Sequence, residues 1–120
     1  MKHHKKGRTL GRDRKGKVAL VRSLALSLIY REKIQTTEAR AKELRPFIER
    51  LITHAKKNTL ASRRMLISRL GGAEAAERGA SKLITKIAPK YEKRAGGYTR
   101  VVKLPSRLSD SAKLAMIEFV

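Results

Sequence analysis

The sequence predicts an α+β domain in which about four helices pack on a small sheet. Three observations lead to this prediction. Several stretches place apolar residues at helical spacing, a short β-favouring segment follows the first of them, and two alternating stretches near the C-terminus favour an antiparallel hairpin. A basic N-terminal extension precedes all of these elements.

The N-terminal extension is strongly basic. Residues 2–17 hold eight Lys and Arg and a single acid, Asp13, and they show no apolar periodicity. Because such a segment has nothing to bury, we expect residues 1–16 to form a binding arm that is disordered when free. A merely solvated tail is the alternative. A single globular domain should then occupy residues 17–120.

Residues 17–31 are expected to form the first helix. Its apolar residues occupy two opposite sides of the helical wheel, one including Val21 and Leu28 and the other including Leu26, so this helix should be buried on more than one face. Residues 33–36 (KIQT) then favour a brief strand.

The second helix has the cleanest periodicity in the chain. Thr36 or Thr37 can cap its N-terminus, and Glu38 suits its first turn. Pro46 lies inside it and removes one backbone hydrogen bond at a cost of about 3 kcal/mol, so we expect a kink or weakened turn but not two helices. One stripe should face the core: Ala41, Leu44, Ile48, Leu51, Ile52 and Ala55.

Two shorter helices are predicted next. Asn58 or Thr59 can cap the third helix, which runs to Leu70 and ends at two glycines. The fourth has acids in its first turn and lysines in its last, as the helix dipole favours. Gly79 should weaken its middle and Pro89 should stop it.

The C-terminal part is expected to form the hairpin. Residues 98–104 (YTRVVKL) alternate, and residues 114–120 favour a second strand. No linker, internal repeat or low-complexity tract divides the chain.

The charge of the chain points to a polyanion as its partner. Thirty Lys and Arg against ten Asp and Glu leave a formal charge of +20, which repels itself in a compact state unless it is neutralised. Nucleic acid is the expected partner, because the longest uncharged stretch has only eight residues, far fewer than the roughly 18 of a membrane span. Arg22 also interrupts the apolar run that could resemble a secretory signal, and no cysteine is present, which fits a cytoplasmic location.

No group of residues stands out as catalytic or metal-binding. His3, His4 and His54 lack a second histidine or carboxylate at ligand spacing. Gly96 and Gly97 lack the lysine and serine that complete a nucleotide-binding P-loop. We therefore expect no enzyme activity, no cofactor, no metal and no small-molecule substrate.

Three segments carry features of RNA binding: the arm, the third helix and the loop at residues 90–100. In that loop two glycines let the backbone approach a phosphate, while Tyr91 and Tyr98 offer stacking surfaces. The alternative is a glycine turn that leads into the hairpin, with Tyr98 packed as core. Arg63 and Arg64 point about 100° apart on a helix, so they suit two separate strands, or they form a solvated face. The candidate RNA-binding residues are Lys2, His3, Lys5, Lys6, Arg8, Arg12, Arg14, Lys15, Lys17, Arg63, Arg64, Lys93, Arg94, Gly96, Gly97, Tyr98 and Arg100.

Several motifs in order resemble the bacterial large-subunit ribosomal protein seventeen family from one end of the chain to the other. They are the opening MKH with LGR at 10–12, IQTT at 34–37 with AKELR at 41–45, LITHAK at 51–56, and RAGGYTR at 94–100. The chain departs from the family at residues 106–112, where Ser109 stands in place of the glycine expected in the hairpin connection.

The resemblance implies a two-layer α/β domain with a basic extension, seated on large-subunit ribosomal RNA near the outer mouth of the polypeptide exit tunnel. Neighbouring large-subunit ribosomal proteins are the implied protein partners, with no enzyme activity, no cofactor and no membrane. Three other classes stay open from the residues alone: a nucleoid protein that compacts DNA, an RNA-modifying enzyme and a cationic membrane-surface protein. The nucleoid protein ranks first among them, because charge alone does not distinguish DNA from RNA.

Overall fold

The structure is a computed structural model and describes residues 7–120. The elements in chain order are α1 (Arg14–Arg31), β1 (Lys33–Thr37), α2 (Glu38–Lys57), α3 (Leu60–Arg69), α4 (Glu74–Lys82), the π-helical turn η1 (Leu83–Ile87), the 3-10 turn η2 (Ala88–Tyr91), β2 (Thr99–Leu104) and β3 (Leu114–Phe119). The predicted α+β class, with four helices and a small antiparallel sheet, is confirmed.

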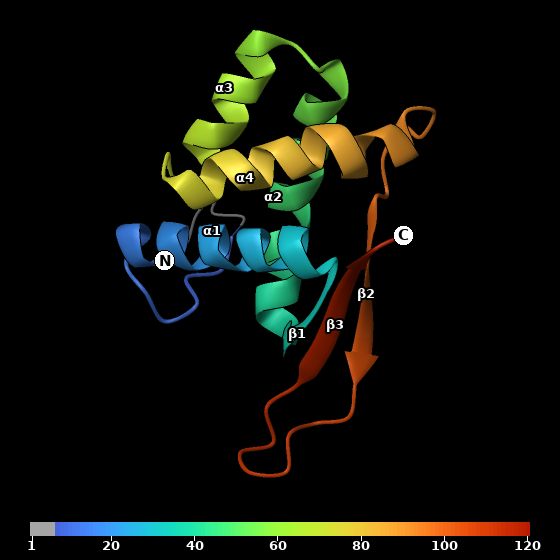
Figure 1. Cartoon of the computed structure of the whole chain (residues 1–120). Helices are drawn as coiled ribbons and strands as arrows, with labels where there is room; N and C mark the ends of the chain where they lie inside the picture. Colours follow the sequence, from blue (N-terminus) through green and yellow to red (C-terminus); the bar gives the residue numbers. More distant parts are fainter. Residues whose placement is uncertain (1–6) are drawn as a thin grey trace.

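The sheet has the strand order β1-β3-β2, so the last strand of the chain lies in its centre. Both pairings are antiparallel, and Glu118 of β3 stands between Lys33 of β1 and Arg100 of β2. Strand β3 alternates, so Ala115 and Ile117 are fully buried while Leu114, Met116 and Glu118 are only partly covered. Figure 1 shows the sheet at one end of the molecule, with the long β2–β3 loop projecting beyond it.

Helix α2 connects the sheet to the other helices and packs against α1, α3, all three strands and the turns η1 and η2 (Figure 1). Thr37 caps its N-terminus by accepting a hydrogen bond from the backbone N–H of Arg40, as predicted. Pro46 lies within one uninterrupted helix. All six residues of the predicted core stripe are buried: Ala41, Leu44, Ile48, Leu51, Ile52 and Ala55.

Helix α1 lies between α2 and α4, which accounts for its two apolar sides. Gly79 of α4 makes this packing possible, because a Cβ there would lie 2.9 Å from Cδ2 of Leu26. The glycine predicted only to weaken α4 therefore has a packing role. The helix also begins at Arg14, earlier than expected, because the carboxylate of Asp13 accepts a hydrogen bond from the N–H of Gly16 at 2.8 Å.

The end of the fourth helix differs from the prediction. The α-helical part stops at Lys82, before Pro89, and the chain continues helically through η1 and η2 to Tyr91. Pro89 lies in the first turn of η2, where its missing N–H would have had no partner within the helix. The predicted stop at this proline is therefore wrong.

Candidate nucleic-acid interface

The described part of the basic arm runs back along the folded domain. Lys17 and Arg8 both pair with the carboxylate of Glu43 on α2, with N–O distances of 2.9 and 3.8 Å. Burial acts to raise the pKa of Glu43, but the Lys17 and Arg8 hydrogen bonds and charges outweigh it and hold that pKa below its usual value. Arg8 and Lys17, two of the predicted RNA-binding residues, therefore also make ion pairs within the folded domain.

The other predicted arm residues differ in how much they contact the protein. Arg12 donates a hydrogen bond to the backbone carbonyl of Leu10, and Arg14 and Lys15 are exposed in the first turn of α1. Lys2, His3, Lys5 and Lys6 lie outside the described residues.

The loop before β2 is built around two buried tyrosines. Tyr91 and Tyr98 are only 4% and 3% exposed, and their ring centroids lie 5.3 Å apart. The Tyr98 hydroxyl donates to the carbonyl of Arg94, and Lys56 donates to both that hydroxyl and that carbonyl. Neither ring offers a free face to a base, so the interpretation of Tyr91 and Tyr98 as stacking surfaces is wrong for this conformation. Tyr98 is a core residue, the alternative that the sequence left open.

The two glycines of this loop are required by its backbone. Gly96 and Gly97 have φ of +140° and +63°, which side chains rarely tolerate. Lys93 and Arg94 are exposed on the same turn. Arg100 donates to Glu118 at 2.6 Å, and this hydrogen bond is the main reason that the pKa of Glu118 is lowered.

A long segment without carboxylates forms the end of the molecule that lies away from the sheet, as Figure 1 shows for α3. Residues 50–73 contain no Asp or Glu, and Arg63, Arg64 and Arg69 are exposed on α3. Burial and then the charges of Lys57 and Arg69 lower the pKa of His54, as expected in a positive field.

The structure adds residues to this surface that sequence reasoning missed. Nε of Arg22 on α1 donates to the backbone carbonyl of Arg69 at 3.0 Å, which brings the N-terminal half of α1 beside the end of α3. Arg50 of α2 lines a neighbouring hollow, which shares Val18 and Phe47 with the hollow between α1 and α3. The missing carboxylates between residues 50 and 73 were the sequence signal that could have pointed to this face.

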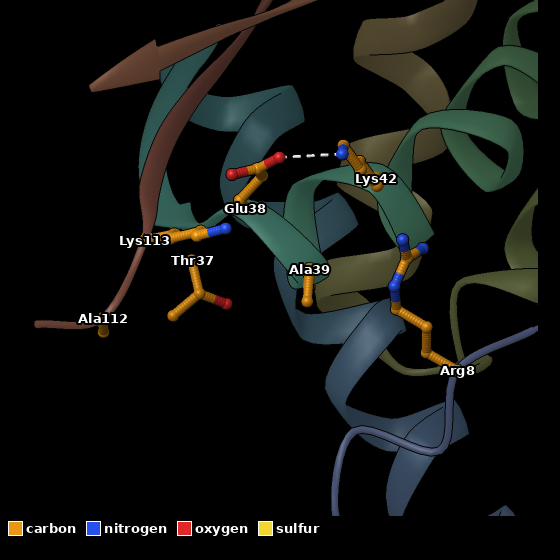
Figure 2. Close-up of a pocket in the computed structure, with 7 residues that line it drawn as sticks. All are labelled: Arg8, Thr37, Glu38, Ala39, Lys42, Ala112 and Lys113. Atoms are coloured by element: carbon orange, nitrogen blue, oxygen red, sulfur yellow. Dashed lines mark ion pairs between the residues drawn. The ribbon is translucent and has the colours of Figure 1, made fainter. Parts of the chain in front are cut away.

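A separate hollow of about 290 Å³ lies at the N-terminus of α2, as Figure 2 shows. Its cations include Arg8 and Lys113, but Lys42 is paired with Glu38 at 2.7 Å. The first N–H groups of the helix also have partners. The N–H of Glu38 donates to the backbone carbonyl of Lys113, and the Thr37 hydroxyl accepts from the N–H of Arg40. The protein itself thus satisfies two of the first three N–H groups of this helix, those of Glu38 and Arg40.

Comparison with known proteins identifies the family. The profile of a family described as Ribosomal protein L17 matches residues 20–120. A protein of Hydrogenobaculum sp. named large ribosomal subunit protein bL17 is 54% identical over all of this chain and 99% of its own length. The protein of the same name from Fusobacterium nucleatum is 48% identical, with both chains covered completely. The chain belongs to the ribosomal protein L17 family.

Membership of the ribosomal protein L17 family confirms several predictions. The chain is a ribosomal structural component and not an enzyme, and its location is the ribosome of the bacterial cytoplasm.

Within residues 7–120, no group of His, Asp or Glu could hold a metal ion, and no helix is long and apolar enough to cross a membrane.

The ion pairs of this L17 family member are concentrated in one part of the fold. Six carboxylates hold nine basic side chains in the described part, fewer than half of the thirty Lys and Arg of the chain. The carboxylates lie at the end of α1, along α2 from its first residue to Glu49, and in the hairpin: Glu32, Glu38, Glu43, Glu49, Asp110 and Glu118. Within the described residues, no ion pair involves α3.

Proposed function

We propose that this chain is a structural constituent of the large ribosomal subunit that binds and stabilises large-subunit ribosomal RNA, and so supports subunit assembly and translation. The observation that carries the proposal is the separation of charge: carboxylates neutralise cations around the sheet, while the cations of α3 have no such partners among the described residues. A polyanion supplies the missing negative charge. The names of the relatives agree with this role.

The proposed mechanism is structural. The helices and the sheet form a rigid body, and the basic arm, the loop at residues 93–100 and α3 each neutralise phosphates where RNA segments converge. If about eight phosphates are neutralised, the affinity should fall by several decades between low and moderate salt through counterion release. Paired RNA offers little sequence to read in its narrow major groove, so selectivity should come from RNA shape.

The proposed site on the subunit is near the outer mouth of the polypeptide exit tunnel, beside neighbouring ribosomal proteins. The family resemblance supports this location. Since the chain has no cysteine and Leu108 at the hairpin tip is fully exposed, a Leu108→Cys variant can carry a single hydroxyl-radical source. Cleavage of ribosomal RNA segments around the tunnel mouth is the expected result, and cleavage confined to the subunit interface would overturn this location.

The decisive experiment for the function is sedimentation of a gently prepared lysate through a salt-containing sucrose gradient, with fractions probed for this chain. Comigration with large subunits at near one copy each supports the proposal. Recovery with the nucleoid, or at the top of the gradient, would contradict it and make a DNA-binding function the better explanation.

A further inference from the structure

Two neighbouring hollows form one groove with an apolar floor between α1, α2 and α3. The first, of about 330 Å³, and the second, of about 230 Å³, share Val18 and Phe47 as lining residues. Val18 is 41% exposed, and Phe47 is partly buried against the core. We call this surface, defined by Val18, Phe47, Arg14, Arg22, Arg50 and Arg69, the α1–α3 groove.

Basic side chains line both halves of the α1–α3 groove. Arg14 and Arg50 border the first hollow, and Arg22 and Arg69 border the second. The carboxylate that lines the groove, Glu43, is already held by Lys17 at 2.9 Å and by Arg8. Since Nε of Arg22 is anchored on the carbonyl of Arg69, its guanidinium is held at the rim with its terminal nitrogens left for a ligand.

We infer that the α1–α3 groove binds an unpaired nucleotide of the ribosomal RNA, with the base on Val18 and Phe47 and its phosphates on the flanking arginines. This inference rests on the proposed function and names the part of the RNA that the site takes. Paired RNA presents phosphate and ribose at its surface and would leave the apolar floor against polar groups. An unpaired nucleotide supplies both a flat apolar face and negative charge, as in other proteins that bind single strands.

The size and charge of the groove favour a base over a protein segment. The larger hollow, of about 330 Å³, is at the small end of the range for small-ligand sites, which suits one planar group. Four arginines around one floor, with no free carboxylate among its lining residues, match a polyanion better than a peptide of mixed charge.

The test uses the full chain and homologous large-subunit ribosomal RNA. Val18→Glu places a carboxylate on the floor, and Val102→Glu is its matched control, because Val102 is 43% exposed on β2, away from the groove. Phe47→Leu keeps an apolar floor but removes the aromatic ring, and circular dichroism of all three variants shows whether they fold. Binding is measured by titration at several salt concentrations. Base-specific chemical probing and hydroxyl-radical footprinting of the complexes then report on bases and backbone separately.

The expected result is about tenfold weaker binding for Phe47→Leu, with an unchanged slope of log affinity against log salt, because stacking releases no counterions. At least one base that the wild-type chain protects should become reactive in both groove variants, while the backbone footprint stays. Val102→Glu should leave that base protected.

Two results would overturn the inference. The first is wild-type base protection by both groove variants, in which case the footprint still supports the proposed function. The second result is that the two groove variants, in assembled subunits, lose a cross-link to a neighbouring protein while every base stays protected. A neighbouring protein, and not a base, would then occupy the groove. A wild-type chain that leaves no footprint would overturn the proposed function together with this inference.

Discussion

The sheet end and the α3 end of this molecule both carry lysines and arginines, but these side chains have different partners at the two ends. Around the sheet, Glu38 and Glu118 each lie within ion-pair distance of two cations. Along α3 the arginines are exposed, and residues 50–73 contain no carboxylate. Basic charge therefore contributes to folding at one end and stays available for a partner at the other.

This difference limits what a count of charges can predict. Arg8, Lys17 and Arg100 were candidates for RNA binding, and each is paired with a carboxylate in the folded chain. Exposed ion pairs contribute only about 0–1 kcal/mol each, so a phosphate can compete for these cations. The α3 arginines need no such exchange, and we expect them to contribute more to RNA affinity.

The sharpest test of the comparison replaces three cations at each end. Changing Arg63, Arg64 and Arg69 to Ala should lower the salt slope of RNA binding by about 2 to 3 and weaken binding by about 100-fold at moderate salt. The free energy of unfolding should change little, because these side chains are exposed on a helix that tolerates alanine. Titration with ribosomal RNA over a salt series gives both quantities.

The matched control changes Lys33, Arg100 and Lys103 to Ala, which removes the same charge from the sheet end. These residues pair with Glu118 and Glu38, so the control should lower the stability at neutral pH and reduce the salt slope less than the α3 triple. An equal loss of slope in both triples would show that the ion pairs do not decide which end binds RNA.

Tyr98→Phe tests whether the loop before β2 belongs to the core. Removing the hydroxyl removes two hydrogen bonds, the one that it donates to the carbonyl of Arg94 and the one that it accepts from Lys56, so the unfolding free energy should fall by about 1–2 kcal/mol in denaturant titrations. Tyr30→Phe is the control, because that hydroxyl also donates to a carbonyl but its side chain is 43% exposed and water can replace it. A Tyr98→Phe variant as stable as the wild type would mean that the hydrogen bonds of this hydroxyl do not stabilise the loop.

The sequence predicted the elements whose signals are local. The apolar stripe of α2, the Thr37 cap and the C-terminal hairpin depend on neighbours within a few residues, and the structure confirms them. The position of β3 in the centre of the sheet depends on pairing with β1, about eighty residues earlier, and no periodicity contains that information.

The candidate interface was harder to predict, because it depends on contacts between residues that are far apart in the sequence. Arg22 and Arg69 meet across 47 residues, and Arg100 meets Glu118 only because the hairpin register places them opposite each other. A single sequence shows the charges but not their partners. The loop tyrosines illustrate the same limit, since aromatic residues beside basic ones fit both a stacking site and a core until burial is known.

Glu43→Gln tests the smaller contribution of the ion pairs to folding. The pKa of this carboxyl is lowered from 4.5, so its stabilising effect is fully present above that value and is lost as the pH falls through the folded-state pKa. The variant should lose about 0.5–1 kcal/mol at pH 7 and nothing at a pH well below the folded-state pKa. Urea titrations at both pH values measure the difference. Glu92→Gln, at an exposed carboxylate with no ion pair in the described part, should stay within about 0.5 kcal/mol of the wild type at pH 7.

An effect of similar size is expected at the hairpin tip, where the family resemblance led us to expect a glycine at Ser109. The left-handed backbone is instead at Ser111, with φ of +58°, and its N–H donates to the carbonyl of Arg107. Ser111→Gly should raise the unfolding free energy by about 0.5–1 kcal/mol, because a Cβ is strained in this conformation. Ser109→Gly, at a position with negative φ, should be neutral or destabilising by a few tenths of a kcal/mol through added freedom of the unfolded chain. If Ser109→Gly were the stabilising change, the left-handed residue would be two positions earlier, and the connection would follow the pattern that the resemblance implied.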